Sequence, residues 1–118
     1  METIKFTFNW NKKLETDTFT TIRMENPHKY KLGEVYNIIQ QEKGVNRDRG
    51  QGKIIELCSI KLHQLKEINC YLDTGYSMDA TKDIIYKMYP GKDWNQQKLY
   101  YMLIQKVKQE TKTGNLFE

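Results

Sequence analysis

A run of polar β-branched residues that ends in an arginine constrains the fold of this chain most. Its members are Thr16, Thr18, Thr20, Thr21 and Arg23. Branched Cβ atoms favour extended backbone, so the run predicts a strand over residues 19–23. Alternate side chains of a strand share a face, which places Thr21 and Arg23 together with Phe19.

A hydroxyl and a guanidinium on one face are a candidate ligand site. Threonine both donates and accepts hydrogen bonds, and arginine adds a planar fork of donors that suits phosphates, carboxylates or base edges. Thr21 and Arg23 would form a site if this face opens onto a cleft. The alternative is that Arg23 forms a structural ion pair with Glu34 or Asp73. Phe19 is either a core anchor or a stacking platform.

Several motifs follow in a fixed order along the chain: TFTTIR, KYKLGEVYNI, GKIIELCSIKL, MDATKDIIYKMYP and a final aromatic strand. This order resembles the ASCH family of the PUA-like superfamily, small β-barrel domains associated with RNA. The resemblance runs from about Ile4 to Val107. It implies an α+β fold, a small PUA-like β-barrel with one or two short helices.

The resemblance implies a module that binds RNA or a nucleotide-like ligand. The cleft would be lined by Thr21, Arg23 and Tyr30, with Thr18 and Lys31 beside it. A basic loop would contact phosphate. A protein-interaction domain is a further alternative.

One branch of the ASCH family implies a second activity, removal of the acetyl group from acetylcytidine by a lysine, a threonine and an acid. By position the threonine is Thr21, and the acid comes from near Asp73. The family lysine falls on Thr18, and a neutral hydroxyl cannot supply its charge. We therefore favour binding over catalysis, unless Lys29 or Lys31 reaches the site.

The segment QEKGVNRDRGQGK is rich in glycine and charge, which predicts a mobile hairpin arm rather than a stable element. Flexible cations beside glycines suit contact with a phosphate backbone. They are Lys43, Arg47, Arg49 and Lys53. The alternative is a solvated charged hairpin. Upstream, Lys12 and Lys13 are interpreted as a solvated turn.

The remaining pattern predicts strands over residues 4–10, 35–40, 53–62 and 99–108, the last with a helix as its alternative. A helix is predicted after Ser77, whose hydroxyl caps its first turn, and Pro90 ends it. Its apolar stripe is Ala80, Ile84, Ile85 and Met88. A crossover over residues 63–76 is predicted to bury Leu65, Ile68 and Leu72.

Composition limits the remaining possibilities. The 118 residues suit one domain, predicted over residues 1–108 with a polar tail over 109–118. A net charge of +4 makes a polyanionic partner plausible. No secretory signal or membrane-spanning stretch is evident, so we expect a cytoplasmic protein without membrane association. No cofactor or metal is predicted, because His28 and His63 are far apart and Cys58 and Cys70 are isolated thiols, expected to be reduced and at least partly buried.

Overall fold

The computed structural model of the chain describes residues 1–108. Its strands are β1 (Thr3–Phe6), β2 (Thr18–Met24), β3 (Val35–Glu42), β4 (Val45–Lys61) and β5 (Lys98–Lys106). Its helices are the 3-10 helices η1 (Trp10–Glu15) and η2 (Leu62–Gln64) and the α-helices α1 (Glu67–Thr74) and α2 (Met78–Met88). The fold is therefore α+β, and β5 is a strand rather than the alternative helix.

The strands form one mixed sheet in the order β1-β3-β4-β5-β2. The β1–β3 pair is parallel, and the other neighbours are antiparallel. Within residues 1–108, the edge strands β1 and β2 share no ladder, so the sheet is open and the predicted β-barrel is wrong. The short β1 is followed by the turns of η1, and the rings of Phe6 and Phe19 stand between the two edges with centroids 5.8 Å apart.

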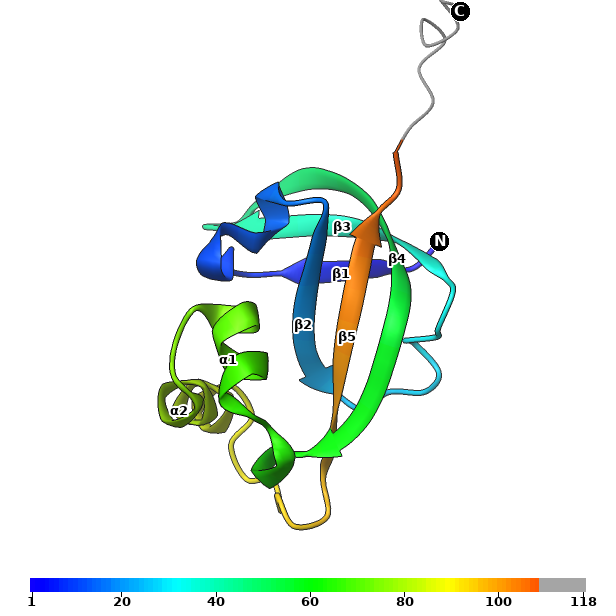
Figure 1. Cartoon of the computed structure of the whole chain (residues 1–118). Coiled ribbons are helices and arrows are strands. Elements are labelled where there is room, and N and C mark those ends of the chain that lie inside the picture. The colour runs from blue at the N-terminus through cyan, green and yellow to red at the C-terminus, as the bar shows by residue number, and fades with distance from the viewer. Residues whose placement is uncertain (109–118) are drawn as a thin grey trace, which may run out of the picture.

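Figure 1 shows β2, β5 and β4 side by side, with β1 and β3 crossing behind them. The helices lie beside the free edge of β2, where α1 packs on β2, η1 and α2. One core cluster consists mainly of side chains from the five strands and includes the fully buried Tyr36, Ile38, Ile54, Met102 and Ile104. The other joins the helices to the sheet through Leu62, Leu65, Cys70, Ile85 and Leu99.

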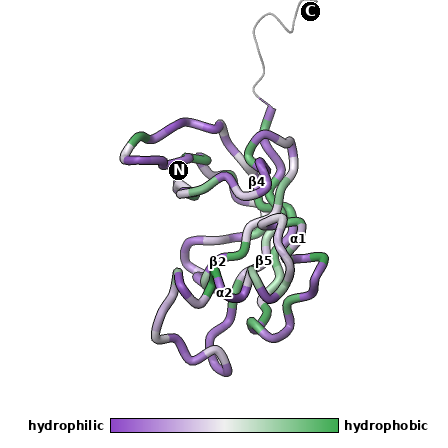
Figure 2. The backbone as a smooth tube through the Cα atoms, turned by 90° about the vertical axis from the view of Figure 1, so that its left-hand side faces the viewer, coloured by the Kyte–Doolittle hydropathy of each residue, from purple (hydrophilic) through white to green (hydrophobic). Residues whose placement is uncertain are grey.

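The segment over residues 41–53 is a hairpin, as predicted, but it forms strand on both sides of a tight turn, with one register irregularity between Asp48 and Gln51, where no stable element was expected. The turn is Lys43-Gly44, with φ of 52° and 78°, and two residues with positive φ match the right-handed twist of a hairpin. In Figure 2 this hairpin, called the β3–β4 arm below, extends from the body as a mostly hydrophilic tube. Backbone pairing stabilises the arm even though its side chains bury little surface.

The crossover also differs from its prediction, since it contains α1. Leu65 is buried as expected, but Ile68 is 64% exposed and Leu72 is 50% exposed. Helical periodicity directs Cys70, Asp73 and Thr74 inward instead.

The helix α2 begins after Ser77 as predicted, and the strand β1 ends earlier than predicted. The helix after Ser77 is confirmed, and the Ser77 hydroxyl accepts a hydrogen bond from the amide of Ala80. Of its predicted stripe, Ile85 is buried and Met88 is exposed. The first strand ends at Phe6 rather than at residue 10. The Cys58 thiol is exposed, not partly buried.

The predicted tail over residues 109–118 lies outside the described residues. Within the described part, no helix is both long and apolar enough to cross a membrane.

Candidate functional site

A pocket of about 250 Å³ lies at the free edge of β2, where β1, η1, α1 and α2 meet. Polar and charged side chains form about half of its lining: Lys5, Thr7, Lys13, Thr21, Arg23, Asp73, Thr74 and Thr81. Apolar and aromatic side chains complete the wall, namely Phe6, Phe8, Trp10, Ile22, Ile84, Ile85, Met88, Tyr89 and Leu99. The lining thus carries three cationic side chains against one carboxylate.

Lys13 reaches this pocket because η1 is kinked. Asn11 and Lys12 adopt left-handed backbone, with φ of 56° and 52°, and this turn directs the next side chain inward. Left-handed backbone is costly for residues other than glycine, and asparagine tolerates it best. The interpretation of Lys13 as part of a solvated turn is therefore wrong, whereas Lys12 is exposed as expected.

Lys13 forms a buried ion pair with Asp73 of α1. Its Nζ donates to Asp73 Oδ1 over 2.8 Å, and the side chains are 5% and 7% exposed. The Thr20 hydroxyl donates to the same oxygen over 3.3 Å. Burial lowers the pKa of Lys13 against the attraction of Asp73, and burial raises the pKa of Asp73 against the attraction of Lys13. The pair is a cationic and an anionic group held out of water at the pocket wall.

Thr21 and Arg23 lie together in the pocket, as their spacing predicts. Arg23 Nε donates to Thr21 Oγ1 over 3.0 Å, and the guanidinium carbon lies 4.4 Å from the centre of the Phe6 ring. Among residues 1–108, no carboxylate lies within 4.0 Å of the Arg23 guanidinium. The alternative of an ion pair with Glu34 or Asp73 is therefore wrong. No side chain among residues 1–108 accepts a hydrogen bond from the terminal nitrogens of Arg23, which can therefore face a ligand.

Tyr30 does not line the pocket. Its ring is 8% exposed and packs edge to face on Tyr100, with centroids 6.3 Å apart, in the core of the sheet. Thr18 and Lys31 are exposed and also lie outside the pocket wall. Phe19 was expected to be either a core anchor or a stacking platform. It is buried and packs on Phe6, so it is a core anchor.

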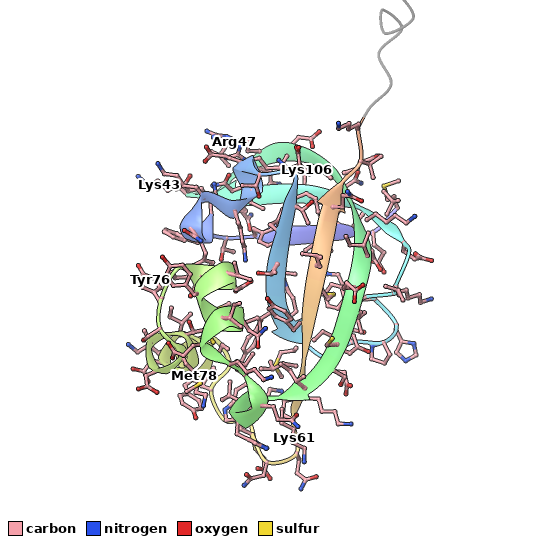
Figure 3. All side chains as sticks on the ribbon, in the orientation of Figure 1. Lys43, Arg47, Lys61, Tyr76, Met78 and Lys106 are labelled. Carbon is pink, nitrogen blue, oxygen red and sulfur yellow. The ribbon has the colours of Figure 1, made fainter. Side chains whose placement is uncertain are left out.

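The predicted basic residues of the arm lie apart from the pocket wall. Lys43 and Arg47 border a separate hollow with Gln40, Glu42 and Val45. Figure 3 shows Lys43 and Arg47 beyond η1 at the arm. Arg49 Nε donates to Gln40 Oε1 over 2.8 Å, which holds it on its own hairpin, and Lys53 is exposed on β4.

Sequence reasoning missed Lys13 and the aromatic residues Phe8 and Trp10. Alternation along residues 4–10 assigned both rings to a strand, but the backbone leaves the sheet after Phe6. The available signal for Lys13 was its position just before Leu14, a buried residue in an otherwise polar segment.

Comparisons of the chain with protein-family models, with curated proteins and with solved structures returned no match. Within residues 1–108, no group of three or more histidine, cysteine or acidic side chains is arranged to hold a metal ion.

Proposed function

We propose that this chain binds a nucleotide-like ligand in the pocket between β2 and the helices. The resemblance to ASCH domains in the order of its motifs supports the same class of ligand. The pocket lining combines cations with apolar and aromatic side chains, as small-molecule sites do.

The observation that carries this proposal is Arg23. Its guanidinium is half-buried, fixed by Thr21 at one nitrogen and stacked on Phe6, and no described carboxylate lies within 4.0 Å of it. A positioned arginine with free terminal nitrogens suits two parallel hydrogen bonds to a phosphate. Lys5 adds a second cation at the same wall.

Calorimetric titration with cytidine 5′-monophosphate tests the proposal. Hydrogen bonds to a charged group contribute about 1.5–3 kcal/mol, so Arg23→Ala should weaken binding at least tenfold. Arg47→Ala, which removes an exposed arginine of the arm, is the matched control and should leave the dissociation constant unchanged. Equal affinity in wild type and Arg23→Ala would refute phosphate recognition by Arg23.

A second function, hydrolysis of an acetylated cytidine, is favoured by one specific observation. At the position of the family lysine this chain has Thr18. Lys13, however, reaches the pocket from η1 and pairs with Asp73. A lysine from another segment therefore lines the same pocket as Thr21, which supports this second function.

The chemistry would use these three side chains in distinct roles. Thr21 Oγ1 would attack the acetyl carbonyl carbon, and the C–N bond would break to leave the acetyl group on Thr21. Lys13 Nζ would first pass a proton to Asp73 Oδ1, to which it is hydrogen-bonded, and the neutral amine would then accept the Thr21 hydroxyl proton and return it to the departing amine. Water would then hydrolyse the ester and release acetate, while Asp73 holds Lys13 in place.

Release of acetate from N4-acetylcytidine tests this second function. If it holds, wild type turns over the compound and Thr21→Val, which keeps the shape of the side chain, abolishes turnover. Thr20→Val should reduce the rate less, because Thr20 contacts Asp73 and does not line the pocket. The absence of acetate from wild type would leave ligand binding as the function of this pocket.

A further inference from the structure

Three aromatic side chains form a continuous group at the pocket, called the aromatic rim below: Phe8, Trp10 and Tyr76. The Phe8 and Trp10 ring centroids lie 4.5 Å apart, and those of Trp10 and Tyr76 lie 5.9 Å apart, edge to face. Phe8 and Trp10 line the pocket, and Tyr76 lies between α1 and α2 on the same side of the molecule (Figure 3).

Two of the three rings of the rim are exposed, and Trp10 between them is partly buried. Phe8 is 52% exposed and Tyr76 is 50% exposed. Phe8 continues the alternation of Ile4 and Phe6, but the strand ends at Phe6 and the ring stands at the surface. A contiguous group of exposed aromatic rings at a pocket is typical of a binding surface.

The charge of the pocket decides which occupant suits the rim. The same pocket is lined by Arg23, Lys5 and the Lys13–Asp73 pair, so a wholly apolar ligand would cover the half-buried Arg23 guanidinium without giving it an anionic partner. A molecule with a flat ring at one end and an anionic group at the other satisfies both parts of the pocket. A nucleotide with an unpaired base has this form.

We propose that the aromatic rim, with Phe8 as its main contact, stacks on the base of the ligand, so that the pocket takes a free nucleotide or an unpaired base. This inference rests on the proposed binding function and adds the part of the ligand that the rim recognises. Stacking on an aromatic side chain requires an unstacked base, which excludes a base inside a duplex.

Two probes separate the contribution of the base from that of the phosphate. Cytidine 5′-monophosphate carries both groups, and ribose 5-phosphate carries the phosphate and sugar alone. Base stacking on an aromatic side chain should make the first bind about tenfold more tightly by calorimetry. Phe8→Ala should remove this difference and leave the affinity for ribose 5-phosphate unchanged.

Two further variants serve as controls. Phe8→Leu keeps apolar bulk without the aromatic ring, and it should lose most of the preference for the nucleotide. Tyr71→Ala removes an even more exposed ring of α1 that does not line the pocket, and it should have no effect. Thermal melting followed by circular dichroism checks that each variant is folded.

The outcomes separate this inference from the proposed function. If Phe8→Ala binds the nucleotide as wild type does, or wild type binds both probes equally, the rim does not recognise the base. The proposed function still holds in that case if Arg23→Ala weakens both probes. If neither probe binds wild type, the proposed function and this inference are both wrong.

Discussion

Lys13 Nζ and Asp73 Oδ1 lie 2.8 Å apart although the residues are 60 positions apart in sequence. The pair joins η1 to α1 and closes one wall of the pocket. Removing two charges from water costs several kcal/mol per ion, and an ion pair in the interior recovers this only with good geometry. Such a pair is weak evidence for stability, so its position at a pocket favours a functional role.

Loss of Lys13 should destabilise the fold in a way that depends on pH. Lys13→Met leaves the Asp73 carboxylate buried without its partner, which should cost about 3–5 kcal/mol of unfolding free energy at pH 7. Burial raises the folded-state pKa of Asp73 above 3.8, so its favourable contribution is full below pH 3.8 and is lost as pH rises through the folded pKa. The cost should therefore shrink as pH falls from 7 toward 4, as urea unfolding can measure. Lys12→Met, at the exposed neighbour, should change stability little at either pH, and a pH-independent cost for Lys13→Met would contradict the buried pair.

Loss of Asp73 should show the opposite dependence on pH. Asp73→Asn keeps the shape of the side chain but leaves the Lys13 ammonium unpaired. Burial lowers the pKa of Lys13 below 10.5, so its favourable contribution is full above pH 10.5 and is lost as pH falls through the folded pKa. The destabilisation measured by urea unfolding should therefore be larger at pH 7 than at pH 10. A larger cost at pH 10 would show that the Lys13 ammonium is not desolvated as the structure places it.

Part of this site was predictable from sequence because it depends on short-range periodicity. Thr21 and Arg23 lie two positions apart in a strand, so their shared face follows from the pleat. The Ser77 cap and the strand β5 likewise follow from local preferences. These features need no knowledge of distant contacts.

Other features depend on contacts that no local pattern reports. Lys13 is buried because Asn11 and Lys12 adopt left-handed backbone, which their residue types permit but do not require. Tyr30 lies in the core through packing on Tyr100, which is distant in sequence. The sheet would close only if its edge strands β1 and β2 paired with each other. The length of β1 is set by the turn of η1 that follows it.

A methyl group at Gly52 should destabilise the sheet. A Cβ at Gly52 would lie 2.5 Å from Ile104 Cγ2 and 3.3 Å from Ile38 Cγ1, so neighbouring side chains must shift. Overpacking of this kind typically costs about 1–3 kcal/mol, measurable by urea unfolding of Gly52→Ala. In an Ile104→Ala background the same change should cost much less, because the closest atom is gone. Equal costs in the two backgrounds would show that steric conflict with Ile104 is not the cause.

The β3–β4 arm should affect binding of a polynucleotide without affecting binding of a mononucleotide. Each phosphate contacted on a single strand contributes a slope of about −0.7 to the dependence of log affinity on log salt. Replacing both Lys43 and Arg47 by alanine should therefore flatten this slope by about 1.4 for a single-stranded RNA. The affinity for cytidine 5′-monophosphate should stay the same, since neither side chain lines the pocket. An unchanged slope would exclude the arm from phosphate contact.

Binding in the pocket between β2 and the helices is tested most directly by mapping amide chemical shifts with ¹⁵N NMR during titration with cytidine 5′-monophosphate. Shifts that saturate together and cluster at Phe8, Lys13, Thr21, Arg23 and Asp73 are the predicted result. Saturating shifts confined to the β3–β4 arm, or no shifts at millimolar ligand, would contradict binding in this pocket.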